Sequence, residues 1–164
     1  MHKTALQCLS ILFLLVTTPT GASSLADDGF ETISIFADEA SEDIQPGILH
    51  FKGHFTMQTQ DWKLESEKAI VYGNPDRPDK VTLEGSPARF LINRDAHKGQ
   101  GTVEATAPEM EYLRSTGILR LSGGAILKLD DEIIRSTVIE YNIDTERYQA
   151  GGTEGVLIEV PLVD

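Results

Sequence analysis

The sequence contains a single cysteine, Cys8, and it lies close to the N-terminus. One cysteine cannot form a disulfide within the chain, and a thiolate metal site needs several. Any form of the protein that has lost this residue also has no cysteine nucleophile. The fold therefore has to rest on its hydrophobic core alone.

Basic residues are also scarce, because 14 Lys and Arg stand against 26 Asp and Glu and give a net charge of −12. A nucleic-acid-binding surface needs an excess of Lys and Arg to neutralise phosphates. Peripheral binding to an anionic membrane surface needs the same excess. The composition argues against both kinds of partner. The main effect expected of the acidity is to keep the protein soluble, through charge repulsion between copies.

Patterns typical of catalysis or metal binding are missing as well. The chain has no G-x-S-x-G motif and no pair of carboxylates that stands out for acid–base work. His50 and His54 would lie about 13 Å apart along a strand, too far to share a metal ion. The turn 129–132 lacks the ligand spacing of a calcium loop, and the glycines at 99–101 and 123–124 lack the setting of a phosphate loop. We therefore expect no enzyme, no cofactor and no metal.

Only the N-terminus carries a long apolar run, "ALQCLSILFLLVTTPT", which follows the basic "MHK". The small residues of "GASSLADD" then suit cleavage after Ala26, or alternatively after Ala22. The run is short for a membrane span of about 20 residues, and Cys8 precedes most of it, where a lipid-attachment cysteine should follow it. We expect residues 1–26 to be a cleaved signal peptide and residues 27–164 to form one exported domain.

The remainder of the chain reads as short alternating strands separated by turn residues, without a sustained helical period. This pattern predicts an all-β fold, either a sandwich, a barrel or a roll. Turns are expected at "QPG", "GNPDRPD", "EGSP", "HKGQG", "RSTG", "LDDE" and "AGG". The expected strands cover residues 31–36, 47–58, 61–66, 80–85, 88–93, 117–129, 132–142 and 155–160.

Two of these strands are nearly the same, since "GILHFKGHFTMQ" begins at Gly47 and "GILRLSGGAILK" at Gly117, 70 residues later. A second repeated pattern, which we call the sequence frame, places a small residue three positions before an apolar one, and it occurs four times. Its small residues repeat with the same 70-residue offset. The chain is therefore interpreted as a tandem duplication whose two units complete each other's apolar face. The small residues of this frame are Ala37, Ser66, Ala107 and Ser136.

The order of these segments resembles the OstA-like family. The matching segments are "ISIFADEA", "GILHFKGHFTMQTQDWKLESEKAIVY", "VTLEGSPARF", "GTVEATAPEMEY", "GILRLSGGAILKLDDEIIRSTVIEYN" and "GVLIEVP". The resemblance covers nearly the whole mature chain. It implies an open, V-shaped β-jellyroll with an apolar groove in the periplasm, and a role in carrying lipopolysaccharide toward the outer membrane. It also implies edge-to-edge self-association, an anchored OstA-like subunit in the inner membrane and a translocon in the outer membrane as partners.

An apolar stripe follows the alternation of the strands, and periodicity alone fits a closed core as well as a groove. The resemblance implies that the stripe forms a groove for the acyl chains of lipid A. Basic residues that a phosphate could attract include Arg89, Arg94, Lys98 and Arg120, although their pattern is also that of ordinary surface positions. The predicted groove residues are Ile33, Ile35, Leu49, Phe51, Phe55, Met57, Leu64, Val71, Leu83, Phe90, Met110, Tyr112, Leu119, Leu121, Leu127, Ile139 and Tyr141.

Three functions remain open at this point. The first is a lipopolysaccharide-binding bridge protein that shields acyl chains and docks through the terminal segments "ETISIF" and "GVLIEVPLVD". The second is a structural module of the same family, or an anchored partner, that docks by strand addition and carries no lipid. The third is a glycan-binding sandwich, which the single tryptophan, Trp62, disfavours.

Overall fold

A computed structural model describes residues 32–93 and 101–162, and the expected signal peptide lies outside these residues. The described part consists of β-strands, with bounds β1 Ser34–Phe36, β2 Glu39–Glu42, β3 Ile48–Gln58, β4 Trp62–Asn74, β5 Arg77–Asn93, β6 Thr102–Leu113, β7 Ile118–Leu129, β8 Glu132–Asn142 and β9 Arg147–Glu159. Within the described residues there is no helix long and apolar enough to cross a membrane.

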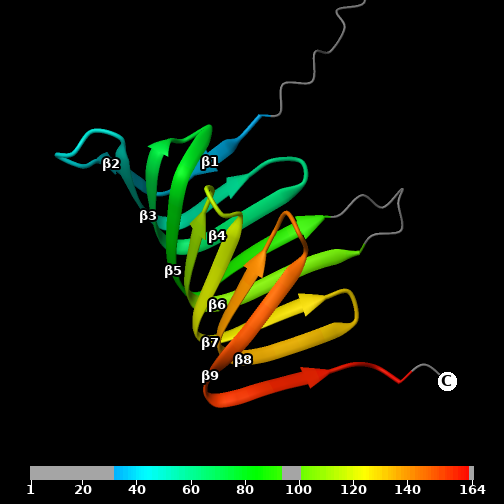
Figure 1. Ribbon diagram of the computed structural model, residues 1–164. Coiled ribbons are helices and arrows are strands. Elements are labelled where there is room, and N and C mark those ends of the chain that lie inside the picture. The colour runs from blue at the N-terminus through cyan, green and yellow to red at the C-terminus, as the bar shows by residue number, and fades with distance from the viewer. Residues whose placement is uncertain (1–31, 94–100, 163–164) are drawn as a thin grey trace, which may run out of the picture. The chain divides into compact units, whose positions relative to one another are not determined.

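The strands form a single antiparallel sheet in which each strand pairs with its sequence neighbour, in the order β1-β3-β4-β5-β6-β7-β8-β9, and β2 also pairs with β3. Figure 1 shows β1 and β2 at one end of this stack of strands and β9 at the other. The all-β prediction is therefore confirmed.

Each long strand bends once, at a break in its pairing register. The breaks fall between Lys52 and Phe55 in β3, Glu65 and Lys68 in β4, and Glu84 and Ala88 in β5. Equivalent breaks interrupt β6, β7 and β8. Because bulges bend a strand and increase its twist, a line of them folds the sheet into two facing halves (Figure 1). We call the half containing β2 and residues 47–52, 68–84, 109–122 and 138–151 the first arm, and the half containing β1 and residues 55–66, 88–93, 101–106, 125–136 and 156–159 the second arm.

Small side chains occupy the bend because the two arms approach each other most closely there. Ala88 pairs with Ala107, and Ala125 pairs with Ser136, and all four are buried. Gly123 and Gly124 of β7 have φ values of 88° and 99°, a region that side chains rarely adopt. The small residues of the sequence frame thus mark the fold line of the sheet.

Two expected turns are bulges within longer strands. Residues 84–87 ("EGSP") lie inside β5, which runs without interruption from Arg77 to Asn93. Residues 150–152 ("AGG") lie inside β9, which begins at Arg147, well before the expected 155. Glycine and proline mark bulges as well as turns, so sequence alone did not separate the two cases.

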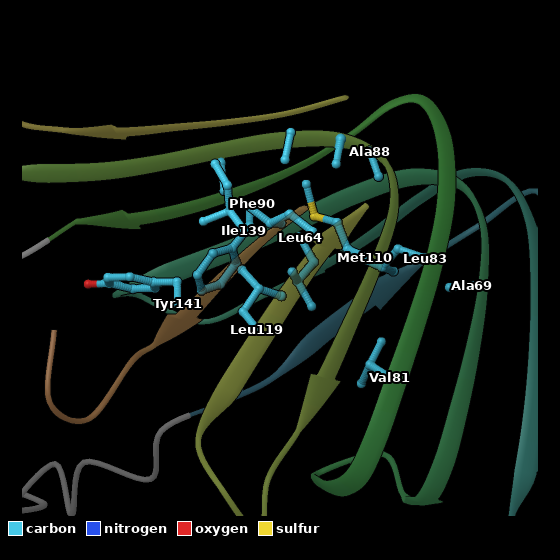
Figure 2. Packing of buried hydrophobic residues seen from close by; sticks show 14 of the residues in the cluster. Leu64, Ala69, Val81, Leu83, Ala88, Phe90, Met110, Leu119, Ile139 and Tyr141 are labelled. Atoms are coloured by element: carbon cyan, nitrogen blue, oxygen red, sulfur yellow. The ribbon is translucent and has the colours of Figure 1, made fainter. Parts of the chain in front are cut away.

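The inward side chains form rows that cross the sheet from strand to strand, in cross-strand register. One row of the second arm reads Ile35, Met57, Leu64, Phe90, Ala105, Leu127, Ile134 and Ile158. The facing row of the first arm reads Phe51, Ala69, Leu83, Met110, Leu121, Ile139 and Ala150. Side chains of both arms meet in one cluster, with Leu64 and Phe90 from the second arm and Met110 and Ile139 from the first (Figure 2).

The duplication is visible in these rows. Residues 70 positions apart occupy the same row, as Met57 and Leu127 do in the second arm and Leu121 and Phe51 do in the first. The pair of short strands β1 and β2 corresponds in the same way to β6, so that Ile35 matches Ala105. The predicted tandem repeat is therefore confirmed.

We predict an alkaline loss of stability that depends on Tyr148 of β9. Its hydroxyl donates a hydrogen bond to Glu132 Oε1 at 2.9 Å, and this bond, with some desolvation, raises the pKa of the phenol. A raised tyrosine pKa stabilises the fold at pH below about 10, the unfolded value, and this stability is lost as pH rises through the folded pKa. Tyr148→Phe should therefore show a smaller fall in melting temperature between pH 9 and 12 than the parent. An equal fall in both proteins would contradict this role.

Candidate lipid-binding cavity

A cavity of about 310 Å³ opens between the two arms, toward the turns that connect the strands. Its walls are mostly apolar, and charged side chains occur only at its mouth on the first arm among the described residues. The second arm contributes Ile33, Met57, Thr59, Trp62, Leu64 and Phe90, and the first arm with its turns contributes Asp76, Arg77, Pro78, Val81, Tyr112, Arg114, Leu119 and Ile143.

The first-arm side of the mouth is built from two turns joined by Arg114. The Nε of Arg114 donates to the Pro78 carbonyl at 3.1 Å, and its Nη2 pairs with Asp79 Oδ1 at 2.5 Å. Gly73, with φ of 88°, leaves room for that aspartate, because a Cβ at Gly73 would lie 2.7 Å from Asp79 Oδ2. Arg114 is therefore held in a fixed position, as charge-assisted hydrogen bonds usually hold a guanidinium.

Tyr112 lies beside these turns and is half-buried. Desolvation by burial raises the pKa of its phenol, the charge of Asp144 raises it further, and the charge of Arg114 acts in the opposite direction. The hydroxyl therefore stays protonated at neutral pH and can donate a hydrogen bond.

The second-arm side of the mouth carries no formal charge among the lining residues. The turn before β4 is closed by a backbone bond from Thr59 to the Trp62 carbonyl at 2.9 Å, and the Trp62 amide donates to Thr59 Oγ1 at 3.3 Å. The ring of Trp62, the single tryptophan of the chain, thus forms part of the cavity wall. The two sides of the mouth differ, because the charged lining residues Asp76, Arg77 and Arg114 lie on the first arm and the second arm presents uncharged Thr59 and Trp62.

The structure places all seventeen predicted groove residues on the inner faces of the arms, although their contact with lipid stays a prediction. Thirteen of them are buried in the packed cluster. The other four, Ile33, Ile35, Leu49 and Tyr112, are half-buried. Those that line the cavity are Ile33, Met57, Leu64, Phe90, Tyr112 and Leu119.

The basic residues singled out in the sequence do not reach the cavity where they are described. Arg89 is exposed on the outer face, and Arg120 pairs there with Glu140 at 2.5 Å. Arg94 and Lys98 lie outside the described residues. The cationic lining residues, Arg77 and Arg114, were missed because they line the same cavity only when segments distant in the sequence come together.

The two histidines, His50 and His54, have a structural role that the sequence did not reveal. His54 Nδ1 lies 2.7 Å from Asp38 Oδ2, and His50 Nε2 lies 2.8 Å from Asp43 Oδ2. These pairs hold the two ends of β2 against β3. The hydrogen bonds from the Gln45 amide and from His50 lower the pKa of Asp43.

Both ends of the sheet have free edges among the described strands, since β9 pairs with β8, and β1 and β2 pair with β3. Apolar side chains are exposed at these edges, at Phe36 on β1 and at Val156, Leu157 and Ile158 on β9. Such edges can accept a further strand.

Known proteins share both sequence and fold with this chain. Over 147 residues it is 26% identical to the lipopolysaccharide export system protein LptA of Haemophilus influenzae, covering 87% of this chain and 84% of that protein. The crystal structure of LptH, the LptA-homologous periplasmic component of the lipopolysaccharide transport device of Pseudomonas aeruginosa, superposes with a TM-score of 0.71. The match covers 80% of this chain and 96% of LptH at 17% identity, and it shows that the fold is shared.

The model of one protein family matches residues 34–147, which is most of the described sheet from β1 to the start of β9. The match confirms the OstA-like resemblance. This chain belongs to the family of the LPS transport protein LptA and the N-terminal domain of LptD.

Proposed function

We propose that this protein carries lipopolysaccharide across the periplasm, shielding its acyl chains between the two arms. The observation that supports this most is the apolar cavity, which opens at the mouth of a sheet whose inner rows are continuous from strand to strand. Water contact costs acyl chains about 25 cal/mol per Å² of apolar surface, so a carrier needs an apolar wall of this kind.

The size of the cavity implies that loading separates the arms. A volume of about 310 Å³ lies at the low end of the roughly 300–1,000 Å³ found for small-molecule sites. A lipid with several acyl chains needs more room than that. The arms are joined through the bend, where bulges replace regular pairing, so their mouth can widen while each arm keeps its hydrogen bonds.

The free edges support a bridging role. The inward row of the second arm ends at Ile35 on β1 and at Ile158 on β9, both next to a free edge. A partner of the same fold could extend this row by adding its own edge strand. Such a partner could be a second copy, an anchored inner-membrane subunit or an outer-membrane translocon. The apolar path would then continue from one protein to the next.

Photo-crosslinking tests lipid carriage directly. A photoreactive residue at Ile143, which lines the mouth, should crosslink to lipopolysaccharide in a saturable manner. The same residue at Arg120, on the outer face, serves as the matched control and should give little crosslink. Equal labelling at both positions, or none at either, would contradict the proposal.

The second candidate function is a module that docks by strand addition without carrying lipid. The burial of thirteen of the seventeen stripe residues favours it, because a filled interior leaves little room for a ligand. Under this alternative the crosslink at Ile143 is absent, while association through the edges of β1 and β9 persists.

A further inference from the structure

The mouth of the cavity is chemically asymmetric, and this asymmetry gives a bound lipid an orientation. Apart from Asp76, the charged side chains that line it are Arg77 and Arg114, both on the first arm. Opposite them, the second arm presents Thr59 and Trp62. Two arginines thus lie at the opening of an apolar cavity, although the chain as a whole carries a net charge of −12.

We propose that Arg77, Arg114 and the Tyr112 hydroxyl bind the phosphate headgroup of an acylated lipid whose chains enter the cavity. The inference rests on the proposed lipid carriage and adds which part of the lipid is recognised, by which residues and on which arm.

Arg114 supplies the preorganised part of this site. Its contacts with Pro78 and Asp79 use Nε and Nη2, and the described residues provide no hydrogen-bond partner for Nη1. Binding to a group that is already fixed loses little side-chain entropy. A guanidinium also suits the geometry of phosphate oxygens.

Arg77 supplies the adaptable part. It is exposed at the first position of β5, next to the turn from β4, and no ion pair of its side chain occurs within residues 32–93 and 101–162. Its charge is therefore not already neutralised by a partner, as that of Arg114 is by Asp79.

Acidic groups near the mouth limit how strongly the site attracts a free anion. Asp76 lines the opening, and Asp144 lies close enough to raise the pKa of Tyr112. Two arginines and three aspartates, counting Asp79, do not attract a free anion strongly from a distance. The phosphate has to be brought there by its acyl chains, and the arginines then act by direct contact.

This predicts a preference for a phosphorylated lipid over its neutral counterpart, and little binding of inorganic phosphate alone. Trp62 fluorescence reports binding, because it is the single tryptophan and lines the cavity. Purified protein should bind bisphosphorylated lipid A about tenfold or more tightly than the same lipid A with its phosphates removed, as expected for charge-assisted hydrogen bonds.

The decisive variant is Arg77→Glu, which is exposed and should leave the melting temperature unchanged. It should reduce the preference for the phosphorylated lipid to about twofold or less, because it weakens binding of the phosphorylated lipid more than binding of the dephosphorylated lipid. Lys128→Glu, an equal charge reversal at an exposed outer position, is the matched control and should keep the full preference. Arg114→Lys should have an intermediate effect, because an ammonium cannot reproduce the forked contacts.

The outcomes separate the two levels of the proposal. If both lipids bind equally well to the unmodified protein, or if Arg77→Glu keeps the preference, the headgroup site is wrong and lipid carriage stands. If neither lipid binds, lipid carriage itself fails. If inorganic phosphate alone binds in the micromolar range and Arg77→Glu removes it, the site serves free phosphate and the lipid assignment is overturned.

Discussion

Replacing Leu121 with aspartate should unfold the domain. Leu121 is fully buried in the first-arm row, between Met110 and Ile139, and it packs in the cluster shared by both arms. A carboxylate there has no partner and is costly to desolvate. Removing one partner of a buried charge pair leaves an uncompensated buried charge and costs about 3–5 kcal/mol. We expect a similar cost for the aspartate here, and it is comparable with the whole stability of many domains, about 5–15 kcal/mol.

A graded series makes this result informative. Leu121→Ala, which leaves a cavity without a charge, should cost about 2–5 kcal/mol. Ile126→Asp, at an outward-facing position of β7 in the second arm, is 37% exposed and should change the stability little. Unfolding by urea, followed by circular dichroism, measures all three. A folded Leu121→Asp protein would show that this part of the interior is open to water, as a groove is and a core is not.

The sequence predicted the inner rows because their signal is local. Alternation with a period of two assigns Phe51, Phe55 and Met57 to one face of a strand, and the 70-residue repeat extends that assignment to the second unit. Antiparallel pairing between consecutive strands then keeps inward residues in register. This explains why the predicted stripe and the observed inner faces coincide.

The mouth of the cavity was beyond sequence reasoning for the opposite reason. Arg114 and Asp79 are 35 residues apart and meet only because two turns lie side by side in the folded sheet. Turn residues have no periodicity, so nothing marked Arg77 or Arg114 among the other basic residues. The pairing of His54 with Asp38 was missed likewise, because it depends on where β2 meets the bend of β3.

The distinction between a turn and a bulge was also not local. Glycine and proline at 84–87 break the pairing of β5 for three residues, after which the same two strands continue to pair. Whether a chain reverses or bends at such a point depends on the strands beside it. In this sheet the neighbouring strands are long and bend at the same level, so β5 bends with them.

Two lysines on β9 should abolish the self-association through which this protein is proposed to form a bridge. Val156 and Ile158 lie on the edge strand β9, on the inner face of the second arm, and are 45% and 49% exposed. A neighbouring copy that adds its edge strand there would bury both side chains. Charged side chains at an edge strand prevent such pairing, because docking would strip them of water.

The double variant Val156→Lys, Ile158→Lys should therefore sediment as a monomer at concentrations where the parent forms assemblies that grow with concentration. Its melting temperature as a monomer should change little, since a lysine stem covers apolar surface while its ammonium group reaches water. Ile126→Lys, on the outer face away from the free edge, is the matched control and should assemble normally. If the double variant assembles at the same concentration as the parent, the copies associate through a surface other than the edge of β9. Loss of assembly together with intact crosslinking of lipid at Ile143 would instead show that a single copy holds lipid and that the edge serves only to pass it on.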